Sequence, residues 1–120
     1  MDFLLFFSSD STGNWYAILD DDVRQYLPPQ MIATIGYNHS IRLFEKSMWD
    51  EKQESFQKAI SMGMTSLKIS LKYAVDCYVG GCNMVLSDAL MQYADISSIA
   101  LLQRDNDIWS ITRYEDKSQL

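Results

Sequence analysis

The sequence predicts an α+β fold: one compact domain over residues 1–120, with a mostly antiparallel sheet of about five to seven strands packed with two or three helices. The length of 120 residues suits one domain. Apolar residues make up 48% of the chain and aromatic residues 12%, which is enough for a hydrophobic core. Segments with two-residue alternation and segments with helical spacing are interspersed, with several hairpin turns between them.

Two apolar segments near the N-terminus predict a pair of neighbouring strands. The run at residues 2–7 is short and rich in phenylalanine, which favours a buried first strand, and a polar loop at 8–13 follows it. Residues 14–19 can pair with this strand. A short helix is expected at 23–27, because the three aspartates before it are stabilised by the free N–H groups of its first turn. Two prolines at 28–29 end this helix.

The middle of the chain predicts a hairpin followed by a helix. Residues 31–37 and 41–45 have the composition of two strands joined by a short turn. A helix is expected over residues 47–62, because a capping sequence opens it and Gly63 is well placed to end it.

Residues 67–79 show the clearest strand pattern, because every second residue is apolar along the whole segment. A helix with an apolar stripe is the alternative, and the uninterrupted alternation favours the strand. After a glycine turn, a helix is expected at 87–97, capped by a serine. Residues 99–103 and 108–114 predict a closing hairpin, and residues 115–120 predict a frayed tail.

The chain is acidic, and the acid is concentrated near its start. Sixteen Asp and Glu residues stand against ten Lys and Arg residues, which gives a formal net charge of −6. Five acidic residues and no basic residue precede Val23. This sign argues against direct nucleic-acid binding and against an anionic membrane surface. It favours a cationic protein partner, and the alternative is that the charge only keeps a small domain dissolved.

Several functional classes are excluded by what the sequence lacks. The longest apolar stretch, residues 3–7, is too short to cross a bilayer and has no basic flank typical of a signal peptide, so a cytoplasmic protein is expected. Cys77 and Cys82 are too few for a disulfide scaffold and are expected to be free thiols. His39 is the single histidine and has the sequence context of a surface turn. No catalytic residue, cofactor or metal site is therefore expected.

Acidic and aromatic side chains are the candidates for partner binding. Carboxylates attract a cationic partner, and tryptophans are frequent anchors at the centres of interfaces. The acidic candidates are Asp20, Asp21, Asp22, Asp50, Glu51 and Glu54. The candidate anchors are Trp15, Trp49 and Trp109. A cation site at the three consecutive aspartates is less favoured, because neighbouring side chains on a helix point in different directions.

At the level of class, the chain resembles the small acidic immunity proteins that bacteria make beside a secreted toxin. The resemblance rests on size, acidity and missing catalytic motifs. It implies an immunity or antitoxin-type inhibitor that covers the active site of a cationic toxin, with a nuclease toxin as one candidate. One alternative is a phage-type inhibitor or nucleic-acid mimic that acts on a host defence or transcription protein. Another is a small enzyme built on carboxylates. A homodimer through an unpaired strand edge is a further arrangement.

Overall fold

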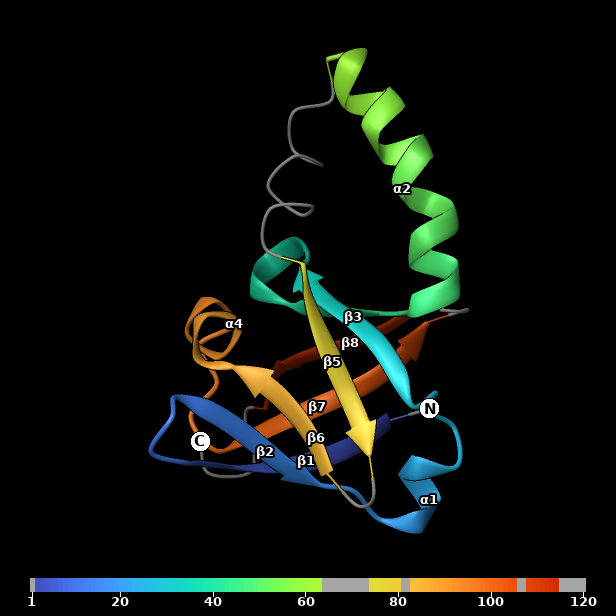
Figure 1. Cartoon of the computed structure of the whole chain (residues 1–120). Coiled ribbons are helices and arrows are strands. Elements are labelled where there is room, and N and C mark those ends of the chain that lie inside the picture. Colours follow the sequence, from blue (N-terminus) through green and yellow to red (C-terminus); the bar gives the residue numbers. More distant parts are fainter. Residues whose placement is uncertain (1, 64–73, 81–82, 106–107, 115–120) are drawn as a thin grey trace.

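The strands of the computed structural model close into an antiparallel barrel (Figure 1). The structure describes residues 2–63, 74–80, 83–105 and 108–114. Around the barrel the strand order is β1-β2-β6-β5-β3-β4-β8-β7. The strands are β1 (Asp2–Ser9), β2 (Asn14–Ile18), β3 (Gln30–Ile35), β4 (Ile41–Glu45), β5 (Val75–Gly80), β6 (Asn83–Ser87), β7 (Ile99–Asp105) and β8 (Ile108–Arg113).

The barrel interior is filled by alternate side chains from all of these strands. Small residues lie opposite large ones: Ala17 on β2 pairs with Phe7 on β1 and with Met84 on β6. Leu5 and Ala100 form a similar pair between β1 and β7. An eight-stranded barrel is just wide enough for its inward side chains to fill it, and this alternation lets them do so. The interior is therefore a packed core.

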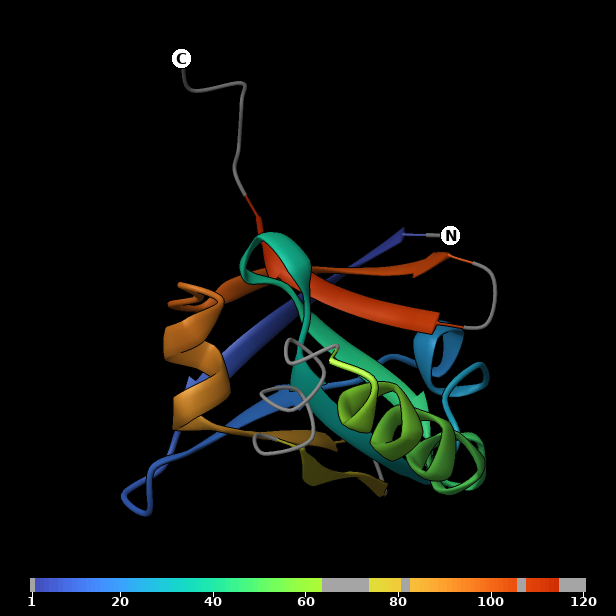
Figure 2. The same cartoon turned by 90° about the horizontal axis from the view of Figure 1, so that it is seen from above.

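Short helices lie at the two ends of this barrel. α1 (Asp21–Arg24) contributes Val23 to the interior core, and α4 (Asp88–Tyr93) contributes Leu90 and Met91. Figures 1 and 2 both show α1 and α4 on opposite sides of the barrel, beyond the ends of the strands. The two helices bury the ends of the apolar interior.

The long helix α2 (Lys46–Ser61) lies outside the barrel, above it in Figure 1. It begins directly after β4, and its Trp49 packs on the outer side of the barrel against Ile32 and Phe44. Lys52 places its ammonium group 5.7 Å from the centre of the Phe44 ring. A second, smaller apolar cluster therefore attaches α2 to β3 and β4. Among the described residues, no helix is both long and apolar enough to span a membrane.

The α+β class and the antiparallel sheet are confirmed, with eight strands in place of the five to seven that were predicted. The strand missing from the prediction is β6, which occupies only five residues between the glycine turn and α4. The part of the predicted strand at residues 67–73 lies outside the described residues, as does the tail at 115–120; β5 begins at Val75. Cys77 and Val79 face the core, as the alternation predicted.

The helix predicted at 87–97 begins after Ser87 as expected but ends early, at Tyr93. Asp95 adopts a left-handed conformation with φ of 55°. The N–H of Ile96 then donates to the carbonyl of Met91 at 3.0 Å, and the N–H of Asp95 donates to the carbonyl of Gln92 at 3.1 Å. This pair of hydrogen bonds is a Schellman ending, which satisfies the last carbonyls and turns the chain toward β7.

Barrel closure corrects two further expectations. The apolar run at residues 2–7 is not buried on both sides, because one side of β1 faces the core and the other faces solvent. Every strand of the barrel also has a neighbour on each side, so the described strands offer no unpaired edge through which two copies could pair.

Candidate interaction surface

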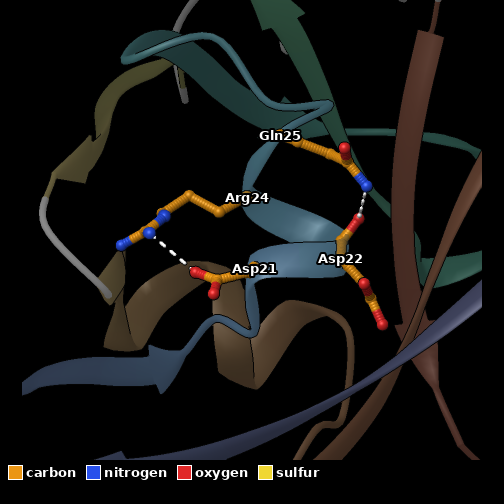
Figure 3. Close-up of polar contacts among 4 residues, drawn as sticks. All are labelled: Asp21, Asp22, Arg24 and Gln25. Atoms are coloured by element: carbon orange, nitrogen blue, oxygen red, sulfur yellow. Dashed lines mark hydrogen bonds and ion pairs between the residues drawn. The ribbon is translucent and has the colours of Figure 1, made fainter.

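Three consecutive aspartates mark the start of α1, all of them exposed. Asp20 is the N-cap residue, although its side chain makes no capping hydrogen bond. The guanidinium of Arg24 donates to the Asp21 carboxylate at 2.7 Å, and Gln25 donates to the backbone carbonyl of Asp22 at 3.2 Å (Figure 3). Figure 3 shows the side chains of Asp21 and Asp22 pointing to different sides of the helix. Within the described residues, the carboxylates of Asp20 and Asp22 have no hydrogen-bonding or ionic partner.

The acidic candidates on α2 form a separate group. Asp50, Glu51 and Glu54 are all exposed on that helix. Figure 1 shows α2 above the barrel and α1 at its lower right, with strands between them. The structure therefore divides the six predicted carboxylates into two sets of three that do not form one continuous patch.

A shallow groove lies at the foot of α2. It has a volume of about 510 Å³ and carries Asp50 and Asp76 together with one basic residue, Lys46. Its remaining lining comes from Ile32, Trp49, Gln53, Ala74 and Val75. Of the α2 carboxylates, Asp50 is the one that borders this groove.

The three tryptophans pack against other residues, and none of them is fully exposed to solvent. Trp109 is 4% exposed inside the barrel, and its ring stacks on Phe3 with the ring centres 6.4 Å apart. Trp49 is 3% exposed beneath α2. Trp15 is half-buried, and its indole N–H donates to the Asp88 carboxylate at 2.9 Å, which ties β2 to α4. Trp49 and Trp109 are therefore core residues in this structure and do not present a surface to a partner.

Most of the large exposed apolar side chains lie instead on one wall of the barrel, whereas Tyr26, Met62 and Val75 are exposed elsewhere. We call the residues on this wall the apolar row: Ile18, Phe6, Ile99 and Tyr114, flanked by Leu4 and Leu101. Phe6 pairs with Ile99 and Leu4 pairs with Leu101 between β1 and β7. The register that pairs Phe7 with Ala17 and Ala100 with Arg113 places Ile18 beside Phe6, and Tyr114 beside Ile99, one residue further along.

One end of the apolar row is strongly exposed and lies close to α1. Ile18 is 74% exposed and Phe6 is 62% exposed. Only Leu19 separates Ile18 from Asp20, so the row runs into the acidic start of α1. The rings of Phe3 and Tyr26, with centres 6.2 Å apart, also bring the chain after α1 against the start of β1. Apolar and acidic side chains are thus adjacent on this side of the molecule.

The loop between β1 and β2 is organised by one carboxylate. Asp10 accepts hydrogen bonds from the N–H and hydroxyl of Thr12, at 2.8 and 2.6 Å, from the N–H of Asn14 at 3.1 Å, and from the hydroxyl of Tyr16. The bonds from Thr12 and Tyr16 hold the pKa of Asp10 well below its usual range, and the bond to Asp10 raises the pKa of Tyr16.

Replacing Asp10 with asparagine is expected to lower the melting temperature at neutral pH, because the charged acceptor is lost. A carboxyl whose pKa is depressed by folding stabilises the protein above its unfolded pKa, and the contribution is lost as the pH falls through the folded pKa. The difference in melting temperature between wild type and Asp10→Asn should therefore shrink as the pH is lowered from about 7 toward about 2. Thermal unfolding across that range measures it; a constant difference would show that the charge of Asp10 contributes nothing.

Cys77 is a free thiol buried in the barrel, as predicted, while Cys82 lies outside the described residues. Burial raises the pKa of Cys77 to about 12, so the thiol is protonated at neutral and mildly alkaline pH. We expect Cys77 to resist iodoacetamide in the native protein and to react fully after unfolding in urea. Peptide mass spectrometry resolves the two cysteines; rapid native alkylation of Cys77 would contradict its place in the interior.

His39 lies in the turn between β3 and β4 and is exposed, as its sequence context suggested. Its Nδ1 is 3.1 Å from the carbonyl oxygen of Tyr93, and the Tyr93 hydroxyl donates to the carbonyl of Gly36 at 2.6 Å. These contacts hold the turn against the end of α4. Within the part of the chain that the structure describes, no three metal-ligating side chains gather at one point.

The chain matches no protein-family model and no curated protein.

Proposed function

We propose that this protein is an inhibitor of the immunity or antitoxin type, which binds a cationic toxin and covers its active site. The observation that carries the proposal is the exposed carboxylate set at the start of α1, in which Asp20 and Asp22 keep their charge available to a partner. These two carboxylates can pair with basic side chains of a partner without first breaking an interaction inside this protein.

The net charge of −6 supports the same proposal. A toxin that acts on nucleic acid needs a basic cleft to neutralise phosphates, and an acidic protein is attracted to that cleft over distances of about 10 Å at moderate salt. The α1 carboxylates are our candidates for the contact itself. The carboxylates of α2, on another part of the surface, act in this account through the overall field of the molecule.

The experiment that tests the proposal is affinity capture from the source cells with the tagged chain, followed by washes of increasing ionic strength. We expect one basic protein in stoichiometric amount, toxic when produced alone and harmless when produced with the chain. Recovery of the chain alone would remove the support for an inhibitor. Recovery of a host transcription or defence protein in place of a toxin would favour the nucleic-acid mimic.

A further inference from the structure

We propose that the apolar row is the hydrophobic centre of the partner interface, and that the partner meets it with an apolar patch rimmed by Lys and Arg side chains. This inference rests on the proposed function and extends it, because it names the footprint and the surface chemistry of the partner. It is carried by side chains that the sequence alone did not single out.

The row crosses adjacent strands as one continuous strip. From β2 to the end of β8 the order is Ile18, Phe6, Ile99 and Tyr114, and each of these side chains is at least 36% exposed. Leu4, opposite Leu101 in the register, widens the strip by one further pair. Scattered single apolar residues are normal on a protein surface, whereas a contiguous apolar patch is typical of an interaction site.

Among the described outward positions of β1, β2, β7 and β8, none around the row carries a Lys or Arg side chain. In the described parts of β1, β2, β7 and β8, the remaining outward positions carry Asp2, Ser8, Asn14, Tyr16, Gln103, Ile108, Ser110 and Thr112. Arg113, next to Tyr114, is held by the carboxylate of Asp95 at 2.7 Å. With Asp20 just beyond Ile18, the strip is apolar at its centre and acidic at one end. The complementary surface is apolar with basic residues at its edge.

The same charges argue against a second copy of the chain as the occupant. In a two-fold dimer each copy presents the same patch, so the acidic end of one strip would lie within the same interface as the acidic end of the other. A chain with ten basic residues against sixteen acidic ones has few cations to offset them. Strand pairing is also closed to a partner here, because the described strands already have neighbours on both sides. Docking must therefore use side chains, with Phe6 as the central aromatic anchor.

Site-specific photo-crosslinking tests this proposal in the intact protein. Photoreactive p-benzoylphenylalanine is introduced in place of Phe6, and in matched variants in place of Met62, Asp20 or Glu51. Met62 is the control for exposure, because it is an apolar residue 77% exposed just beyond α2 and outside the row. The variants are expressed in the source cells, irradiated, and their adducts identified by mass spectrometry.

We expect one abundant adduct with a basic protein from the position of Phe6, a weaker one from Asp20, and none from Met62. Purified partner should then bind Phe6→Ser at least about tenfold more weakly than wild type, and bind Met62→Ser like wild type. Because Phe6 and Met62 are both exposed, neither serine variant should alter the melting temperature appreciably.

Three results would overturn the proposal. An adduct between two copies of the chain at Phe6 would replace the basic partner with a homodimer. Equal adducts from Phe6 and Met62 would show that the row has no special role. A basic adduct from Asp20 or Glu51 with none from Phe6 would reject the apolar footprint and leave the proposed function standing, whereas no basic adduct from any position would reject both.

Discussion

Replacing Leu43 with alanine is expected to lower the free energy of unfolding by about 2–5 kcal/mol. Leu43 is completely buried in the barrel interior, where its register neighbours are Ala33 on β3 and Trp109 on β8. An alanine on one side and a rigid indole on the other leave little that can move into the space, so a cavity should remain. Urea unfolding followed by tryptophan fluorescence gives the free energy.

Ile18→Ala is the matched control for this substitution. It removes a similar aliphatic side chain from a strand of the same barrel, but at a position that is 74% exposed. Ile18→Ala should change the free energy of unfolding by no more than about 0.5 kcal/mol. A loss from Ile18→Ala as large as that from Leu43→Ala would mean that the inward and outward faces of the strands are assigned incorrectly.

Reversing the charges of Asp20 and Asp22 together, as Asp20→Lys with Asp22→Lys, is expected to slow association with the cationic partner by about tenfold or more at low salt. Both carboxylates are exposed at the start of α1, so the main effect is on attraction, and the loss of acidic charge at the helix N-terminus should cost folding only about 1 kcal/mol per residue or less. The difference in association rate between the variant and the wild type should become smaller as ionic strength rises, because salt screens the attraction between the wild-type carboxylates and the partner. Stopped-flow or biosensor kinetics with purified partner measure the rate.

A double reversal on α2, Glu51→Lys with Glu54→Lys, makes the same change in net charge at a different place on the surface. It should slow association less than the α1 variant does. Identical slowing from both variants would indicate that only net charge matters. No slowing from the α1 variant would exclude the start of α1 from the interface.

Local sequence patterns predicted most of the helices and strands, but they did not predict which strands far apart in the chain pair with each other. The β3–β4 hairpin and α2 follow from alternation, turn composition and helical spacing within short windows of sequence. Closure of the barrel depends on contacts such as Trp15 with Leu86, between strands far apart in the chain. No local window contains that information, so an antiparallel sheet was predicted but its closure into a barrel was not.

For the same reason, only part of the candidate site could be predicted from the sequence. Three consecutive aspartates cannot be buried cheaply, so their exposure was predictable from composition. Trp49 and Trp109 belong to the core because of where their strand and helix pack, which the sequence does not state. Phe6 lies within a continuous apolar run. Such a run fits a strand that is buried on both faces, but it also fits a barrel strand with one face exposed to solvent. A strict alternation of polar residues along β1 would have separated the two arrangements.

The most direct test of the inhibitor proposal is titration of the captured basic partner's toxic activity with the purified chain. We expect the toxic activity to fall in proportion to added protein and to disappear at equimolar amounts, because tight binding covers the active site. The Asp20→Lys, Asp22→Lys variant should need a clear excess to abolish the same activity. Full toxic activity at a saturating excess of correctly folded wild-type chain would contradict the proposal.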